Sequence, residues 1–186
     1  PRTMKPSQTP PAAPRPTSRP ESRRTPGPSW WQKSLAISRP RFWLYLAGPY
    51  FLGVAAGADH PAVFWSPLFL VVLGYLLLPA NVFLYGINDR YDADTDQFNP
   101  KKTDKEYRYQ PADAHLIRRW VRLHLLLTLL ILGLLPLGWL SVFIILLLVL
   151  SWSYSAPPLR WKARPWADSL SNCLYLLPGL IGYWLV

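Results

Sequence analysis

Three aspartates near the middle of the chain have the spacing of a metal site. Asp89, Asp92 and Asp96 lie in the stretch NDRYDADTD. A helix turns about 100° per residue, so this spacing places the three carboxylates within an arc of about 60°. Converging carboxylates repel one another unless a cation neutralises them, and an all-oxygen ligand set favours Mg²⁺. The sequence therefore predicts a Mg²⁺ site that keeps positions open for phosphate oxygens.

The same helical face carries further polar groups. Extended towards the N-terminus it reaches Asn88, Tyr85 and Asn81, so a polar stripe leaves the apolar run that precedes the aspartates. The alternative is a solvated acidic helix end that binds nothing. We favour the metal site, because ionisable residues at the end of a very apolar segment are costly and point to function.

Long apolar segments must position these residues. Runs of this length and composition are typical of membrane-spanning helices, whose backbone satisfies its own hydrogen bonds. The sequence therefore predicts an all-α fold, a polytopic transmembrane helix bundle. The five apolar segments lie at about residues 42–58, 63–87, 116–135, 138–153 and 169–186.

Positive charge marks one side of the predicted bundle. All 20 lysines and arginines lie up to Arg41, between Arg90 and Arg122, or between Arg160 and Arg164. With a cytoplasmic N-terminus, five helices place all three regions, and the aspartate motif, on the cytoplasmic side. The net charge of +10 is thereby explained by membrane topology, and we expect no nucleic-acid partner.

Composition divides the chain into two parts. Residues 1–33 are rich in Pro and Arg, and we expect them to form a disordered cytoplasmic tail. Residues 34–186 are expected to form a transmembrane domain. The last apolar segment runs to Val186, so we expect the sequence to continue beyond it.

The connection between the fourth and fifth apolar segments is basic. The stretch YSAPPLRWKARPWADSLSN, residues 154–172, contains prolines that exclude a continuous helix. Arg160, Lys162 and Arg164 alternate, so in an extended stretch they would face the same way. They would either bind the oxygens of a diphosphate or only set the topology. We expect Asp168 in the first turn of the following helix.

NDRYDADTD resembles the N-D-x-x-D-x-x-x-D motif of the UbiA superfamily of intramembrane prenyltransferases and matches it at every fixed position. In that superfamily the acids bind Mg²⁺ that bridges an isoprenyl diphosphate. The resemblance implies catalytic and metal-binding roles for Asp89, Asp92 and Asp96. For the diphosphate it implies a binding set of Asn81, Asn88, Tyr154, Arg160 and Lys162.

The basic loop and the stretch SRPRFWLYLAGPYFLG resemble the carotenoid branch of this superfamily, the lycopene elongases. The resemblance covers about residues 34–186. It implies an enzyme of a bacterial or archaeal cell membrane that transfers a prenyl group from dimethylallyl diphosphate to lycopene or a related carotenoid. Such enzymes have about nine helices and a second aspartate motif on the sixth. This chain would supply five helices and one motif, so we expect it to be inactive alone.

Two other functions stay open at this stage. A UbiA-type prenyltransferase could act on an aromatic, quinone or chlorophyll-type acceptor. A non-enzymatic membrane protein could use the acids to bind or transport a cation. A transporter would place charged residues or broken helices near the bilayer midplane, whereas here the acids lie at the membrane edge, which disfavours transport.

Overall fold

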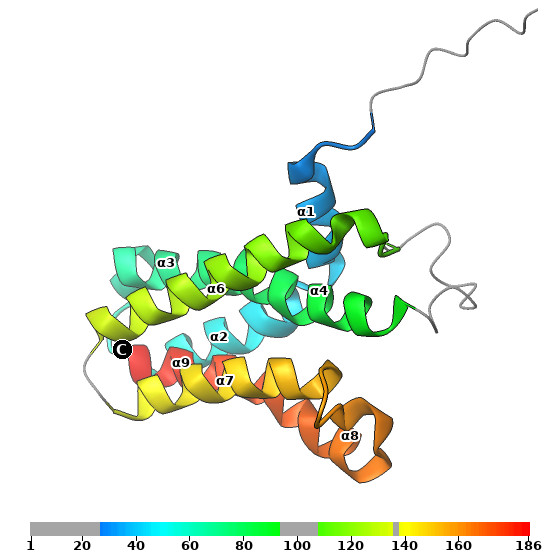
Figure 1. Cartoon of the computed structure of the whole chain (residues 1–186). Helices are drawn as coiled ribbons and strands as arrows, with labels where there is room; N and C mark the ends of the chain where they lie inside the picture. Colours follow the sequence, from blue (N-terminus) through cyan, green and yellow to red (C-terminus); the bar gives the residue numbers. More distant parts are fainter. Residues whose placement is uncertain (1–26, 94–107, 136–137) are drawn as a thin grey trace, which may run out of the picture.

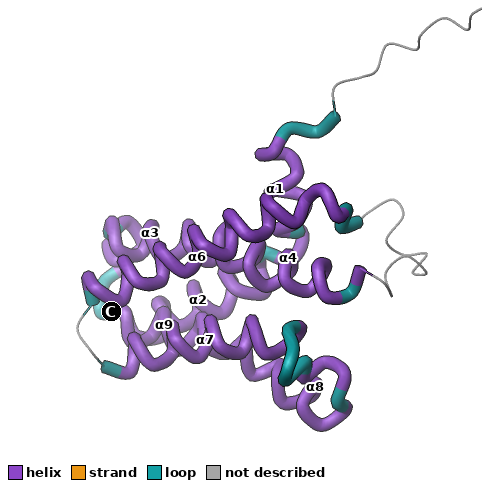
Figure 2. The backbone as a smooth tube through the Cα atoms, in the orientation of Figure 1, coloured by secondary structure: helices purple, strands orange, loops and turns teal. Residues whose placement is uncertain are grey.

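The computed structural model describes residues 27–93, 108–135 and 138–186, which fold into helices packed side by side (Figure 1). Within these ranges the regular elements are all helical and no strand is present (Figure 2). The all-α prediction is confirmed.

Each predicted apolar segment corresponds to a helix or a run of helices. The long ones are α2 (Leu44–Gly57), α6 (Ala114–Leu134) and α7 (Trp139–Ser155). The second segment divides into α3 (Pro67–Tyr75), a π-helical turn (Leu76–Ala80) and α4 (Asn81–Tyr91). The fifth divides into α8 (Pro165–Ser171) and α9 (Leu177–Leu185). Short 3₁₀ turns connect the helices at Pro40–Phe42, Pro61–Trp65, Pro111–Asp113, Trp161–Ala163 and Asn172–Leu176.

One helical run within the described ranges, Pro67–Tyr91, is long and apolar enough to cross a membrane by length and composition. Helices α2 and α7 are apolar but shorter, and α6 carries three arginines in its first half. The helical fold is therefore established, whereas a bundle of five membrane-spanning helices stays a prediction.

The predicted boundary of the N-terminal tail needs a correction. Helix α1 (Trp30–Ser38) begins inside the segment expected to be disordered, residues 1–33. The hydroxyl of Ser29 accepts a hydrogen bond from the backbone N–H of Gln32 at 3.3 Å, and the Gln32 side chain accepts one from the N–H of Ser29 at 2.8 Å. This capping box satisfies the first backbone donors of the helix, so the helical domain begins at Trp30.

A proline and an asparagine determine the path of the chain between α3 and α4. Pro79 lacks an N–H and cannot continue a regular α-helix, because its ring clashes with the preceding turn. The chain passes through the π-helical turn instead. The amide nitrogen of Asn81 donates to the carbonyl oxygens of Leu76 and Leu77 at 2.8 and 3.1 Å. These bonds satisfy carbonyl groups that the altered turn would leave without a donor.

Glycines allow α2 and α9 to approach closely. A Cβ atom on Gly53 would lie 1.9 Å from the backbone oxygen of Gly179, and one on Gly182 would lie 2.3 Å from that of Tyr50. Side-chain atoms do not fit at such distances, so both positions require glycine. The contact packs the first apolar helix against the last (Figure 1).

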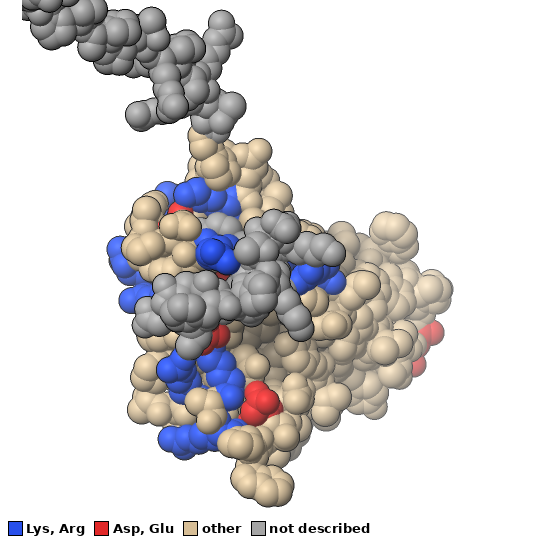
Figure 3. All heavy atoms as spheres, turned by 90° about the vertical axis from the view of Figure 1, so that its right-hand side faces the viewer, with Lys and Arg blue, Asp and Glu red and all other residues tan. Residues whose placement is uncertain are grey.

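Charge and apolar surface lie in different parts of the molecule. Figure 3 looks onto the end where α4, α8 and the start of α6 lie, and lysines and arginines gather there. Along α6, by contrast, Leu126, Leu129 and Leu130 are more than half exposed. The polar end is the one that carries the aspartate motif.

Candidate functional site

The last turn of α4 carries the first part of the motif. Asp89 is fully buried, whereas the Asp92 side chain, at the C-cap of the helix, is 17% exposed. The third predicted ligand, Asp96, lies outside the described residues. In the described part of the chain, no group of three His, Cys, Asp or Glu side chains is arranged to hold a metal. The arc of three carboxylates therefore stays a prediction.

The loop after α7 brings two cations to the end of α4. The Lys162 ammonium donates to Asp92 Oδ2 at 2.5 Å and to Asn88 Oδ1 at 2.9 Å. The Arg160 guanidinium lies 3.4 Å from Asp92 Oδ1 and 3.3 Å from the carbonyl oxygen of Tyr91. Two residues predicted to bind a diphosphate thus contact the aspartate motif, although Lys162 and Asp92 are 70 residues apart in the sequence.

The conformation of this loop differs from the extended stretch that we expected. Trp161–Ala163 form a 3₁₀ turn, and Arg160 has a left-handed backbone with φ 39°. Arg164 is exposed and extended, since it precedes Pro165 at the start of α8. The three cations do not face the same way: Arg160 and Lys162 reach the acids and Arg164 does not. Asp168 lies in the first turn of α8, as predicted.

Arg39 is a residue of the site that sequence reasoning missed. Its guanidinium lies 2.5 Å from Asp89 Oδ1, and its central carbon lies 4.8 Å from the centre of the Tyr85 ring. The Arg39 side chain is 10% exposed and that of Asp89 is fully buried. A carboxylate buried to this extent stays charged only beside a counter-charge. The signal available in the sequence was an arginine followed by Pro40, just before an apolar helix.

The two arginines of the site share an unusual backbone conformation. Across the described ranges, Arg39 (φ 51°) and Arg160 (φ 39°) are the non-glycine residues with positive φ. Such a conformation costs on the order of 1–3 kcal/mol and persists where the surroundings enforce it, often at functional sites. Each arginine contacts an aspartate of the motif, so the strain coincides with the candidate site.

Asn88 joins α4 to the end of α7. Its Oδ1 atom accepts a hydrogen bond from Ser155 at 3.1 Å in addition to the bond from Lys162. Tyr154, predicted to bind the diphosphate, is half-buried and lines a cavity of about 30 Å³ together with Tyr175. In the part of the chain that the structure describes, its hydroxyl makes no hydrogen bond to the motif. Asn88 is therefore placed at the site, and Tyr154 lies beside it.

Asn81 lies about 10 Å along the helix axis from Asn88, since seven residues separate them. It is fully buried, and its amide nitrogen is used by the π-helical turn. Its Oδ1 atom has no hydrogen-bond partner among the described residues. The structure thus gives the Asn81 amide nitrogen a role in the helix and leaves only the oxygen for a ligand.

The site has oxygen ligands for a hard cation and hydrogen-bond donors for an anion. Asn88, Asp89 and Asp92 supply only oxygen atoms, the ligand type that Mg²⁺ prefers. Arg39, Arg160 and Lys162 supply hydrogen bonds and positive charge. Two carboxylates and three cations give these five charged side chains a net charge of +1.

Comparisons with known proteins give relatives of one kind. The chain is 47% identical over 155 residues to a lycopene elongase/hydratase of Haloarcula japonica, a match that covers 80% of this chain and 50% of that protein. It is 45% identical over 152 residues to the protein of the same name from Halobacterium salinarum, covering 79% and 52%. With that of Corynebacterium glutamicum it shares 34% over 154 residues, covering 80% and 51%.

These relatives are the evidence for a carotenoid function. The chain spans about half the length of the curated relatives it matches. No protein-family model matches it, and no solved structure is similar. A carotenoid biosynthesis protein from a Dietzia species also matches, at 31% identity. The chain is thus homologous to proteins named for lycopene and carotenoid biosynthesis.

Proposed function

We propose that the protein is a Mg²⁺-dependent prenyltransferase of the UbiA type, embedded in a membrane. It would transfer a prenyl group from dimethylallyl diphosphate to lycopene or a related carotenoid. The observation that carries the proposal is the contact of Lys162 and Arg160 with Asp92 and Asn88. Two segments that look like a metal motif and a diphosphate loop meet at one end of the bundle.

The diphosphate would bind between the acids and the cations. Asp89, Asp92 and Asn88, with Asp96, would hold Mg²⁺, which supplies Lewis-acid stabilisation of the departing diphosphate. Lys162 and Arg160, which contact Asp92 in the structure, would turn their donors to the phosphate oxygens. A guanidinium and an ammonium so placed stabilise negative charge as it develops on the leaving group.

Other parts of the chain would exclude water from the reacting carbon and position the acids. The C–O bond of the allylic diphosphate breaks with its electron pair on oxygen, and a C=C bond of the acceptor attacks the cation-like carbon. The acceptor cation formed in this way then loses a proton to water, which leaves a neutral prenylated carotenoid and free diphosphate. Apolar helices around the site would keep water from that carbon. Arg39 would act as a positioning residue, because its ion pair holds the buried Asp89 carboxylate in one orientation.

Membrane embedding is part of the same proposal. It is supported by the helical run Pro67–Tyr91 and by the exposed leucines of α6. The charged end would then face the cytoplasm at the membrane edge. A lycopene-like acceptor is apolar and could reach the site sideways from the lipid.

A transfer assay tests this proposal. Membranes that contain the full-length protein, rather than residues 1–186 alone, are incubated with dimethylallyl diphosphate and either lycopene or a hydroxybenzoate, with Mg²⁺ or with a chelator. We expect a Mg²⁺-dependent product one prenyl unit heavier than lycopene. A prenylated hydroxybenzoate without a prenylated carotenoid would contradict the acceptor. Product formed equally in the presence of the chelator would contradict the metal.

A further inference from the structure

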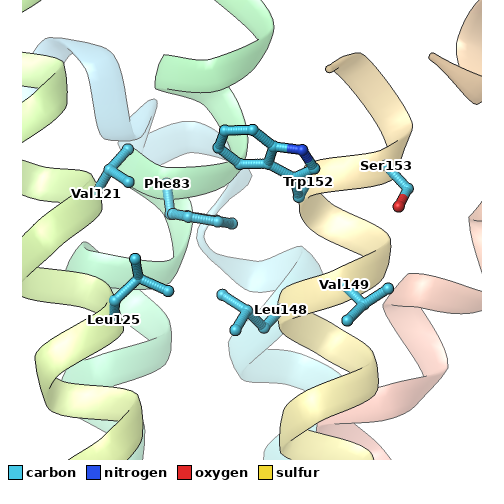
Figure 4. A pocket seen from close by; sticks show the side chains of 7 residues that line it. All are labelled: Phe83, Val121, Leu125, Leu148, Val149, Trp152 and Ser153. Carbon is cyan, nitrogen blue, oxygen red and sulfur yellow. The ribbon is translucent and has the colours of Figure 1, made fainter. Parts of the chain in front are cut away.

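An apolar pocket lies between α4, α6 and α7. Its volume is about 240 Å³, and Figure 4 shows side chains from α6 and α7 pointing toward one another across Phe83 of α4. Leu125 and Trp152 are about 40% exposed, so the pocket opens to the molecular surface. Its main lining residues are Phe83, Val121, Leu125, Leu148, Val149 and Trp152.

This pocket is separate from the candidate diphosphate site. Asn88 lies five positions after Phe83 on α4, and Asp92 lies nine positions after it at the C-cap. A helix turns about 100° per residue, so Asn88 lies about 140° and Asp92 about 180° around the axis from Phe83. Asp89 is turned about 120° away. The acids therefore face another side of α4, and the proposed reaction does not use the pocket.

Two arginines flank the pocket on α6. Arg118, Val121, Arg122 and Leu125 have the i, i+3, i+4, i+7 spacing of one helical face. Side chains on a helix lean towards its N-terminus, which for α6 is the charged end of the molecule. Both arginines are exposed. They therefore extend from the apolar pocket towards the polar end, where the proposed membrane placement puts lipid head groups.

The size of the pocket restricts what it can hold. Pockets for whole drug-sized ligands have volumes of roughly 300–1,000 Å³, so 240 Å³ accommodates a segment of hydrocarbon chain. A long polyene does not fit as a whole. A ligand that combines one hydrocarbon chain with a negative charge matches both the apolar lining and the two arginines.

We infer that the pocket binds a segment of one hydrocarbon chain of an anionic membrane lipid, whose phosphate is held by Arg118 and Arg122. The inference rests on the membrane placement proposed above and is independent of prenyl transfer. The bound lipid fills the space between α6 and α7 and ties the start of α6 to the membrane surface.

Native mass spectrometry tests this inference. The full chain, purified in mild detergent, is mixed with equal amounts of phosphatidylglycerol and phosphatidylcholine, and each bound lipid is measured. We expect the wild type to bind mostly phosphatidylglycerol. In the double variant Arg118→Gln/Arg122→Gln, the bound phosphatidylglycerol should fall about tenfold, because two charge-assisted contacts are lost. Leu125→Trp, which fills the pocket, should reduce binding of both lipids.

A matched control and a competition experiment complete the test. Arg164→Gln removes an exposed arginine from the same end of the molecule but away from the pocket, and should bind lipid as the wild type does. Thermal unfolding of each variant shows that it is folded. Unchanged lipid binding in both pocket variants would overturn the inference, and so would displacement of the lipid by lycopene. The readout is bound lipid, so this failure would leave the prenyl transfer proposal standing.

Discussion

The two described aspartates of the motif have different surroundings. Asp89 is fully buried beside Arg39, whereas Asp92 is partly exposed and contacts Arg160 and Lys162. Removal of one partner from a buried ion pair strongly destabilises the folded protein, because the other charge loses that compensation. Asp89 should therefore matter for folding as well as for activity, and Asp92 mainly for activity.

Removing the carboxylate of Asp89 should destabilise the protein. We expect Asp89→Ala to lower the free energy of unfolding by about 3–5 kcal/mol, since it breaks an ion pair whose side chains are 10% (Arg39) and 0% (Asp89) exposed. Thermal or denaturant unfolding in detergent measures the effect. The matched control is Asp59→Ala at an exposed aspartate after α2, which should change stability little. Equal effects of the two substitutions would contradict the role of the buried pair.

Lys162 should contribute directly to use of the diphosphate substrate. Lys162→Gln should lower kcat/KM for dimethylallyl diphosphate by about 10- to 100-fold, the loss of one charged hydrogen bond of roughly 1.5–3 kcal/mol. Arg164→Gln in the same loop should leave kcat/KM unchanged. Initial rates at varied diphosphate concentration give both values, and similar losses in the two variants would indicate a general charge effect.

At the scale of elements, hydropathy predicted where the long helices lie but not their interruptions. The five apolar segments correspond to helices because the length and composition of an apolar run indicate a helix, however the helices then pack. The π-helical turn at Pro79 depends on Asn81 bonding to two carbonyl groups, which composition does not reveal. Helix α1 was missed in part because its cap at Ser29 follows directly on a Pro-rich stretch.

The candidate site was predictable where its signal is local. Asn88, Asp89 and Asp92 follow from the spacing of the motif, and Lys162 follows from its basic loop. Arg39 was not predictable, since its partner Asp89 is 50 residues away and the pairing arises only when α1 packs on α4. The contact of Arg160 with Asp92 likewise joins residues that are 68 positions apart in the sequence.

The crossing of α2 and α9 should depend on its glycines. We expect Gly53→Ala to lower the thermal midpoint of unfolding, because the added Cβ would lie 1.9 Å from the Gly179 backbone oxygen and force the helices apart. Gly48 on the same helix has nothing within 4 Å of such an atom. Gly48→Ala should therefore keep or raise the midpoint. A lower midpoint for Gly48→Ala than for Gly53→Ala would contradict this packing.

At the scale of the whole molecule, lysines and arginines gather at one end (Figure 3). Leucines along α6 are exposed. Arg39, at the C-terminal end of α1, contacts Asp89. Asp59 follows the far end of α2, a helix that is about 20 Å long. In a membrane these two ends would lie on opposite sides. The proposed orientation places the motif in the cytoplasm.

Cysteine labelling tests this orientation. The sequence has one cysteine, Cys173, so Cys173→Ser gives a background in which Asp59→Cys or Arg164→Cys is introduced. A membrane-impermeant maleimide added to intact cells should label Asp59→Cys and not Arg164→Cys. Permeabilised cells should give labelling of both. Labelling of Arg164→Cys alone in intact cells would reverse the topology, and labelling of both would contradict a membrane-spanning arrangement.

The central claim is that the aspartate motif and the basic loop form one site for Mg²⁺ and an isoprenyl diphosphate. Calorimetric titration of the full chain with a non-reactive thio-analogue of dimethylallyl diphosphate, with and without Mg²⁺, tests it most directly. We expect Mg²⁺-dependent binding that Asp92→Asn and Lys162→Gln each weaken about tenfold or more. Asp59→Asn and Arg164→Gln should bind as the wild type does. Binding that is indifferent to Mg²⁺ and to both site substitutions would contradict the claim.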